Sequence, residues 1–221
     1  MRSVIMDLED RNYSIGRLLD HLDEISEMRG KVDVTVVLKS SVFIALYNNI
    51  EATVYAVFEA VHDALSDCQY EELSQSLKVK LLRYSFGRTA GAFMQDSLKV
   101  SEEIDKLKAS CQTFPGLSSF LRRQSLFSGN VDARKLNVIG ISYGMPKLSF
   151  VKEDAERMLW VKNKRNKIAH GEQSMSDGGQ GIKTTDLRKA FVSVGVILHG
   201  FISAANTFVV STQLERSMRT S

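Results

Sequence analysis

The segment from Val161 to Gly171, VKNKRNKIAHG, holds the residues whose types and spacing could do chemistry. It gathers several cations and then continues with His170 and a glycine-rich stretch. An arginine can hold a phosphate with two parallel hydrogen bonds, and histidine gains and loses a proton near neutral pH. The segment therefore indicates a site for a phosphodiester such as a nucleic-acid backbone. Four cations lie within six positions: Lys162, Lys164, Arg165 and Lys167.

Helix geometry limits how these side chains can meet. Asn166 and His170 are four residues apart and share one helix face, whereas Arg165 lies about 140° around the helix from His170. One helix alone would not bring the arginine and the histidine together well. Two such helices at a two-fold interface would, because each histidine could face the arginine of the partner. This geometry predicts a homodimer.

Each of these residues also has an ordinary structural explanation. A histidine near a helix C-terminus followed by Gly171 is what a left-handed cap and the helix dipole favour without any chemistry. Lys162, Lys164 and Lys167 are predicted to contact an RNA backbone, and the alternative is a solvated helix face.

The rest of the chain predicts helices that would position this segment. Only two prolines occur, and apolar residues recur at three- and four-residue spacing, which predicts an all-α fold in one domain spanning residues 1–221. An irregular insertion is expected over about 113–149, with Asn130 as a helix cap, and an exposed flexible loop over about 171–183. A first helix is expected to end near Gly30. Further helices are expected over about 33–65, 70–86, 95–109, 152–170 and 184–216.

Three stretches carry a resemblance to a known family. RNKIAHG, from Arg165 to Gly171, resembles the RNxxxH form of the Rx4-6H motif of the HEPN superfamily, the higher eukaryotes and prokaryotes nucleotide-binding domains. LYNNIEATV at 46–54 and FSGNVDARKL at 127–136 resemble the MAE-type branch of HEPN-like nucleases in bacterial defence and toxin-antitoxin loci. The resemblance implies a HEPN-like helical bundle with long antiparallel core helices and an irregular helical insertion.

The resemblance also implies a function. It points to a metal-independent endoribonuclease without cofactors, whose composite site forms across a homodimer and leaves 2′,3′-cyclic phosphate and 5′-hydroxyl ends. His170 would move protons, Arg165 would stabilise the transition-state charge, and Asn166 would orient substrate or imidazole. RNA would be the substrate, and an antitoxin or companion defence protein a further partner. The alternative is a non-catalytic HEPN module that binds RNA or nucleotide, or bridges subunits of a defence complex.

The two other stretches contain polar residues with open roles. Glu51 is a candidate supporting acid that pairs with Arg165 or His170, and the alternative is that Asn49 and Glu51 satisfy the interior of a long helix. Asn130 and Asp132 are predicted to cap a helix.

Composition and charge indicate in which cellular environment the protein works and which partners it can have. The net charge of +3 neither demands nor excludes a nucleic-acid partner, and Cys68 and Cys111 form no metal-binding pattern. The N-terminal residues lack a secretory signal pattern, which predicts a cytoplasmic protein. The apolar segment 190–212 approaches membrane length, but polar residues interrupt it and favour a buried core helix over a membrane span. Four residues are predicted to have structural roles: His21, His62, His199 and Trp160.

Overall fold

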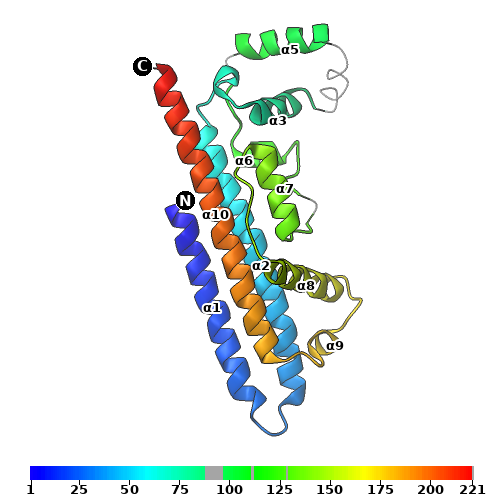
Figure 1. The fold of residues 1–221 in the computed structure, drawn as a ribbon. Coiled ribbons are helices and arrows are strands. Elements are labelled where there is room, and N and C mark those ends of the chain that lie inside the picture. Colours follow the sequence, from blue (N-terminus) through cyan, green and yellow to red (C-terminus); the bar gives the residue numbers. More distant parts are fainter. Residues whose placement is uncertain (88–96, 111, 128, 221) are drawn as a thin grey trace. The chain divides into compact units, whose positions relative to one another are not determined.

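The computed structural model describes residues 1–87, 97–110, 112–127 and 129–220, and within these ranges the chain is helical with no β-strand (Figure 1). The all-α prediction is confirmed. The chain forms two compact units, which are described separately. Unit 1 comprises residues 1–56, 129–137 and 148–203, and unit 2 comprises 57–128, 138–147 and 204–221. The single-domain organisation stays a prediction.

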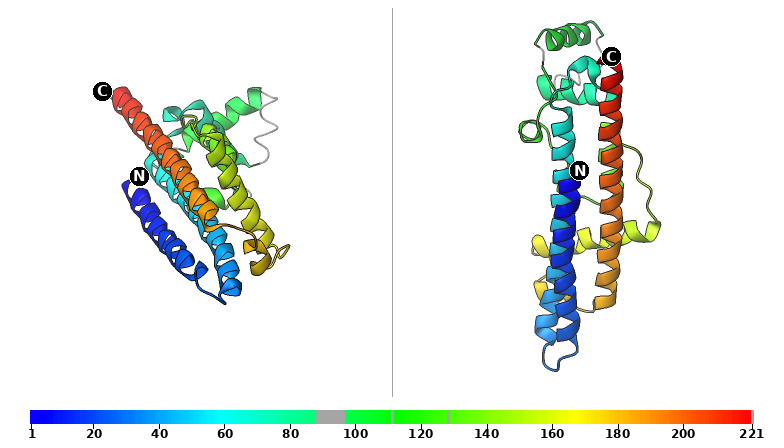
Figure 2. Two further views of the ribbon diagram at one scale, coloured as in Figure 1. Left: turned by 60° about the horizontal axis from the view of Figure 1, so that its bottom comes forward. Right: turned by 90° about the vertical axis from the view of Figure 1, so that its left-hand side faces the viewer.

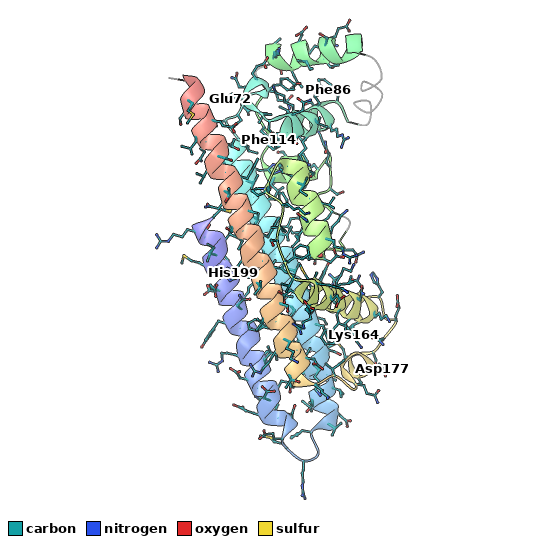
Figure 3. The ribbon with its side chains drawn as sticks, viewed as in Figure 1. Glu72, Phe86, Phe114, Lys164, Asp177 and His199 are labelled. Carbon is teal, nitrogen blue, oxygen red and sulfur yellow. The ribbon has the colours of Figure 1, made fainter. Side chains whose placement is uncertain are left out.

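Three long helices form the frame of unit 1. They are α1 (Arg2–Ser26) and the N-terminal parts of α2 (Val32–Leu65) and α10 (Thr184–Thr220), which lie side by side in Figure 1 and in the left view of Figure 2. Arg188 of α10 pairs with Asp20 and Asp23 near the end of α1, and His199 pairs with Glu9 near its beginning (Figure 3). This register makes α1 antiparallel to α10.

Apolar periodicity explains why α1 and α2 pack together. The buried side chains of α1, from Val4 to Leu22, lie on one face, and each fully buried leucine contributes about 1.5–3 kcal/mol. Arg11 reaches across to α2, where its guanidinium donates to Asn49 at 2.8 Å and Thr53 at 3.1 Å. Asn49 and Thr53 are buried, so these bonds satisfy polar groups that would otherwise be costly. Asn49 therefore has the structural role that was considered for it.

The helix that carries the Arg-His motif is α8 (Lys152–Ala169). Its Trp160 packs edge-on against Phe43 of α2, with ring centroids 4.7 Å apart. A short helix follows, α9 (Met175–Gly179), whose N-cap Ser174 forms a capping box with Asp177.

The prediction of an exposed flexible loop over 171–183 was wrong for its central part. Gly178 and Gly179 of α9 are buried, and a Cβ on Gly179 would lie 1.9 Å from the carbonyl oxygen of Val36 in α2. The glycines there serve close packing of one backbone on another rather than mobility.

Replacing Gly179 with alanine is therefore expected to destabilise unit 1 by about 1–3 kcal/mol, because a backbone oxygen cannot move aside for the methyl group. Urea denaturation measures the effect. Gly200 of α10 is the matched control, since nothing lies within 4 Å of its added Cβ and alanine there should stabilise by about 0.5–1 kcal/mol. Equal behaviour of the two variants would contradict the packing of α9 on α2.

Unit 2 contains the shorter helices and the C-terminal parts of α2 and α10. The helix predicted over 70–86 is interrupted, because Leu73 and Ser74 adopt extended backbone between its two parts. The predicted start near Gln95, together with Cys111 and Ser128, lies outside the described residues. The helices of this unit are η1 (Tyr70–Glu72), α3 (Gln75–Phe86), α5 (Ser97–Ala109), α6 (Leu117–Leu121) and α7 (Ala133–Tyr143), whose first turns belong to unit 1.

His62 lies buried in the core of unit 2. Its Nδ1 donates to the carbonyl oxygen of Pro115 at 2.7 Å, and its Nε2 accepts from the hydroxyl of Tyr143 at 2.9 Å. A carbonyl can only accept, so the neutral imidazole carries its proton on Nδ1. Burial lowers the pKa of His62, and the nearby Lys80 ammonium lowers it further.

This arrangement predicts acid sensitivity of unit 2. Below the ordinary histidine pKa of about 6.5, His62 is protonated in the unfolded chain but stays neutral in the folded protein, where its pKa is lowered. The contribution of His62 to the free energy of unfolding is therefore fully present above that pH and is lost as the pH falls below it. The part of the slope of the free energy of unfolding against pH that is due to His62 should approach about 1.4 kcal/mol per pH unit. Urea denaturation of wild type and His62→Gln between neutral pH and pH 5 measures the difference in slope, with exposed His21→Gln as control. Parallel slopes for wild type and His62→Gln would contradict it.

Two described helices, Val32–Leu65 and Thr184–Glu215, are long and apolar enough to cross a membrane by length and composition. In each, about half of the most apolar window is buried inside the structure, 56% and 44% respectively. Core helices of soluble proteins have the same properties, so the absence of a membrane span stays a prediction.

Candidate functional site

Described residues from each of the three stretches that carry the family resemblance lie together in unit 1 around Arg165. From α8, Arg165 donates through Nη2 to Glu51 of α2 at 3.3 Å and through Nη1 to its neighbour Asn166 at 3.2 Å. Its guanidinium also lies over the ring of Tyr47, 4.3 Å from the centroid. The Arg165 side chain is 23% exposed, so this group is fixed by protein contacts and still reaches solvent.

Tyr47 fixes the third stretch to the same place. Its ring is fully buried, and its hydroxyl donates to the carbonyl oxygen of Gly129 at 2.7 Å and accepts from the N–H of Val131 at 3.0 Å. Burial, together with the neighbouring Glu51 carboxylate, raises the pKa of Tyr47 and keeps the phenol neutral. Sequence reasoning did not single out Tyr47; the available signal was its position one helical turn before Glu51 in LYNNIEATV.

Asn130 does not cap α7, contrary to prediction. Its side-chain oxygen accepts a hydrogen bond from the Asn166 amide. Asn130 thus joins Arg165, Asn166, Glu51 and Tyr47 in one group, which we name the Arg165 cluster. Asp132 directly precedes α7 and accepts from the N–H of Lys135 at 3.0 Å, so the capping role predicted for Asp132 is observed. A capping oxygen normally bonds two or three residues ahead, which Asp132 does and Asn130 does not.

The three lysines near the motif have different environments. Lys162 forms an ion pair with Asp132 at 2.9 Å, and both side chains are largely buried. Lys164 donates to the carbonyl oxygen of Gly178 at 3.2 Å and so ties α8 to α9, near Asp177 (Figure 3). Lys167 is exposed. RNA contact by these lysines stays a prediction, and Lys167 is the one whose exposure suits it best.

Asp132 depends on Lys162 for its charge. Burial opposes ionisation of the Asp132 carboxyl, but the hydrogen bonds from Lys135 and Lys162 outweigh it and lower the pKa. We expect Lys162→Met to destabilise unit 1 by about 1–2 kcal/mol, between the values of exposed and buried ion pairs. Urea denaturation measures the loss, and exposed Lys167→Met should leave stability unchanged. A Lys162→Met protein as stable as wild type would mean that the pair contributes nothing.

His170 is the C-cap of α8, as the structural explanation required. Its backbone N–H bonds to the carbonyl oxygen of Asn166 at 2.9 Å, and Gly171 follows in left-handed backbone with φ of +74°. The ring is exposed and, within the described part of the chain, makes no side-chain hydrogen bond or ion pair. Within one chain Arg165 pairs with Glu51 of α2, and among the described residues no hydrogen bond or ion pair joins it to His170.

The arrangement can do two things chemically. It presents a fixed guanidinium, with N–H groups left over from its two internal bonds, to an anion that approaches from solvent. It also presents an accessible imidazole at the end of the same helix. Among the described residues no group of three or more His, Cys, Asp or Glu side chains is arranged to hold a metal ion.

Comparison with known proteins identifies the family of the chain. A protein-family model described as HEPN_MAE_28990:/-like HEPN matches residues 2–204, a range that contains all three converging stretches. No curated protein and no solved structure matches the chain. The predicted relationship is confirmed. The chain belongs to the HEPN superfamily, in its MAE-type branch, and is a HEPN nuclease or nucleotide-binding module.

Proposed function

We propose that the protein is a metal-independent endoribonuclease of a bacterial toxin-antitoxin or phage-defence system, acting as a homodimer in the cytoplasm. The observation that carries the proposal is the Arg165 cluster, in which a partly exposed guanidinium is held by Glu51, Asn166 and the Tyr47 ring. A scaffold has no need to fix an arginine in this way. A nuclease does, because charge develops on the phosphate in the transition state.

The chemistry divides between two side chains. Arg165 binds the non-bridging phosphate oxygens and stabilises the extra negative charge of the pentavalent transition state. His170 accepts the proton of the 2′-hydroxyl as its oxygen attacks phosphorus, or donates one to the leaving 5′-oxygen. The products are a 2′,3′-cyclic phosphate and a 5′-hydroxyl. Asn166 holds Arg165 through its side-chain oxygen and Asn130 through its amide, so it positions the arginine.

A second copy of the chain completes the site. Since no hydrogen bond or ion pair joins Arg165 and His170 among the described residues of one chain, a composite site formed by two α8 helices would bring an arginine and a histidine to one phosphate. The exposure of His170 at the helix end leaves its ring accessible to such a partner.

The test is incubation of purified protein with end-labelled RNA in excess EDTA, followed by analysis of the product ends. Cleavage that leaves cyclic phosphate and 5′-hydroxyl ends is expected. Cleavage that requires an added divalent cation, or that leaves 3′-hydroxyl ends, would contradict the proposed mechanism.

The alternative function is a HEPN module that binds RNA or nucleotide without cleaving it, or bridges subunits of a defence complex. Expression in cells separates the two. A ribonuclease toxin should arrest growth, and His170→Ala should relieve the arrest without loss of soluble protein. Soluble wild-type protein that leaves both growth and RNA intact favours the binding module.

A further inference from the structure

A second feature of unit 1 adjoins the Arg165 cluster. It is a cavity of about 380 Å³ at the beginning of α7 and along the N-terminal half of α8, and we name it the Phe150 cavity. Its volume falls within the range of small-molecule binding sites, about 300–1,000 Å³. Half-buried Phe150 supplies an aromatic wall, and both charge signs occur among the residues that line the cavity: Asp132, Ala133, Arg134, Phe150, Lys152, Ala155, Glu156 and Leu159.

Short links connect the cavity to Arg165. Asp132, which lines the cavity, is two residues after Asn130 in the segment before α7. Asn130 accepts a hydrogen bond from Asn166, and Asn166 in turn accepts one from Arg165. Leu159, which lines the cavity, precedes Arg165 by six residues, a rise of about 9 Å along α8, so one RNA strand is long enough to occupy the cavity and reach Arg165.

Charge distinguishes this cavity from a neighbouring one on α8. The neighbour, which we name the Trp160 cavity, has a volume of about 400 Å³ and three carboxylates against two cations. Its lining residues are Glu153, Glu156, Arg157, Trp160, Asp186 and Lys189. That balance disfavours a polyanion.

The Phe150 cavity has equal numbers of lining cations and carboxylates, and one of its carboxylates is paired with a lysine outside the lining. Two cations, Arg134 and Lys152, face two carboxylates, and the Asp132 carboxylate is already neutralised by Lys162 at 2.9 Å. Glu156 lies 3.6 Å from Lys152 in an exposed pair, so its oxygens remain accessible to a ligand. The cavity thus combines an aromatic ring, an apolar lining and a cationic excess, which suits a nucleobase attached to a phosphate backbone.

We propose that the Phe150 cavity binds the base of a single-stranded RNA nucleotide next to the phosphate held by Arg165. The base stacks on Phe150, and Arg134 and Lys152 neutralise its phosphate. Glu156 accepts a hydrogen bond from an exocyclic amino group, because an ionised carboxylate can only accept. Uracil has no exocyclic amino group, so the site prefers adenine, cytosine or guanine to uracil. This inference rests on the proposed function for the position of the scissile phosphate, but base binding itself does not require cleavage.

Titration of the full chain with AMP, CMP and UMP, followed by NMR, tests binding without catalysis. AMP and CMP should bind about tenfold more tightly than UMP, and Phe150→Leu should weaken their binding by about tenfold through the loss of stacking. Phe150→Tyr retains the ring and should restore affinity. Glu156→Gln should remove the preference, because an amide both donates and accepts. Trp160→Phe and Lys189→Gln, which alter only the Trp160 cavity, should bind as wild type.

The outcomes separate this inference from the proposed function. Nucleotide binding that depends on Phe150, in a protein that cleaves no RNA, would support the cavity and contradict the nuclease. RNA cleavage with base preference and nucleotide affinity unchanged in Phe150→Leu would support the nuclease and overturn the cavity. Loss of binding in the Trp160 cavity variants alone, or no binding at millimolar nucleotide, would also overturn it.

Discussion

Replacing His170 with alanine is expected to lower RNA cleavage by about 10²–10⁴-fold, the usual contribution of a positioned acid or base. The ring is exposed and, among the described residues, has no side-chain partner whose loss would disturb the fold. The His170 backbone, which caps α8 through its N–H, is retained by alanine. The measurement is the initial rate of cleavage of end-labelled RNA in EDTA, compared with wild type at equal dimer concentration by light scattering.

The matched control is His21→Ala. His21 is likewise an exposed histidine of unit 1, and it lies 3.6 Å from Glu24 of its own helix. The His21→Ala protein should cleave RNA as wild type does. A His170→Ala protein that retains wild-type cleavage would remove the imidazole from the mechanism and leave the capping role as its whole function.

The long helices could be predicted from the sequence because their signal is local. The prediction of a helix over 33–65 matches α2 at Val32–Leu65 closely, because more than thirty residues without glycine or proline exclude strands of ordinary length. The buried stripe from Val42 to Val61 accounts for the β-branched residues in that part of α2, whereas Val32, Val34 and Val37 near its beginning are exposed.

The contacts of the site were only partly predictable. The pairing of Glu51 with Arg165, 114 residues apart, was expected only from the family resemblance, since no local pattern encodes it. The bond between Asn166 and Asn130 was missed because asparagine before a helix is an ordinary cap signal. Lys162 and Lys164 illustrate the same limit, because a run of cations predicts exposure and cannot reveal that two of them have partners within the protein.

The segment 171–183 shows why glycine content is ambiguous. Gly171 and Gly181 adopt positive φ, as turn glycines do, whereas Gly178 and Gly179 are buried because α9 approaches Ser40 and Val36 of α2 closely. Glycine content alone therefore does not distinguish a glycine in a turn from a glycine that allows close packing of two backbones. The approach of α9 also fixes Lys164, so this segment supports the helix that carries the site.

Replacing Arg165 with lysine is expected to lower cleavage by about 10²–10³-fold although the charge is kept, as for the loss of one stabilising donor. A planar guanidinium lies over the Tyr47 ring while it donates to both Glu51 and Asn166. An ammonium ion cannot make these contacts and also hold a phosphate with two parallel bonds.

The matched control is Arg157→Lys, on the same helix, where Arg157 contacts Ser193 at 3.3 Å and Asp154 at 4.0 Å away from the cluster. The Arg157→Lys protein should cleave RNA at the wild-type rate. Glu51→Gln separates positioning from chemistry, because the amide keeps an acceptor for Arg165 and should lower the rate less than Arg165→Lys does. If Arg165→Lys cleaves RNA at the wild-type rate, a point charge suffices at this position. The orientation imposed by Glu51, Asn166 and Tyr47 then serves stability alone.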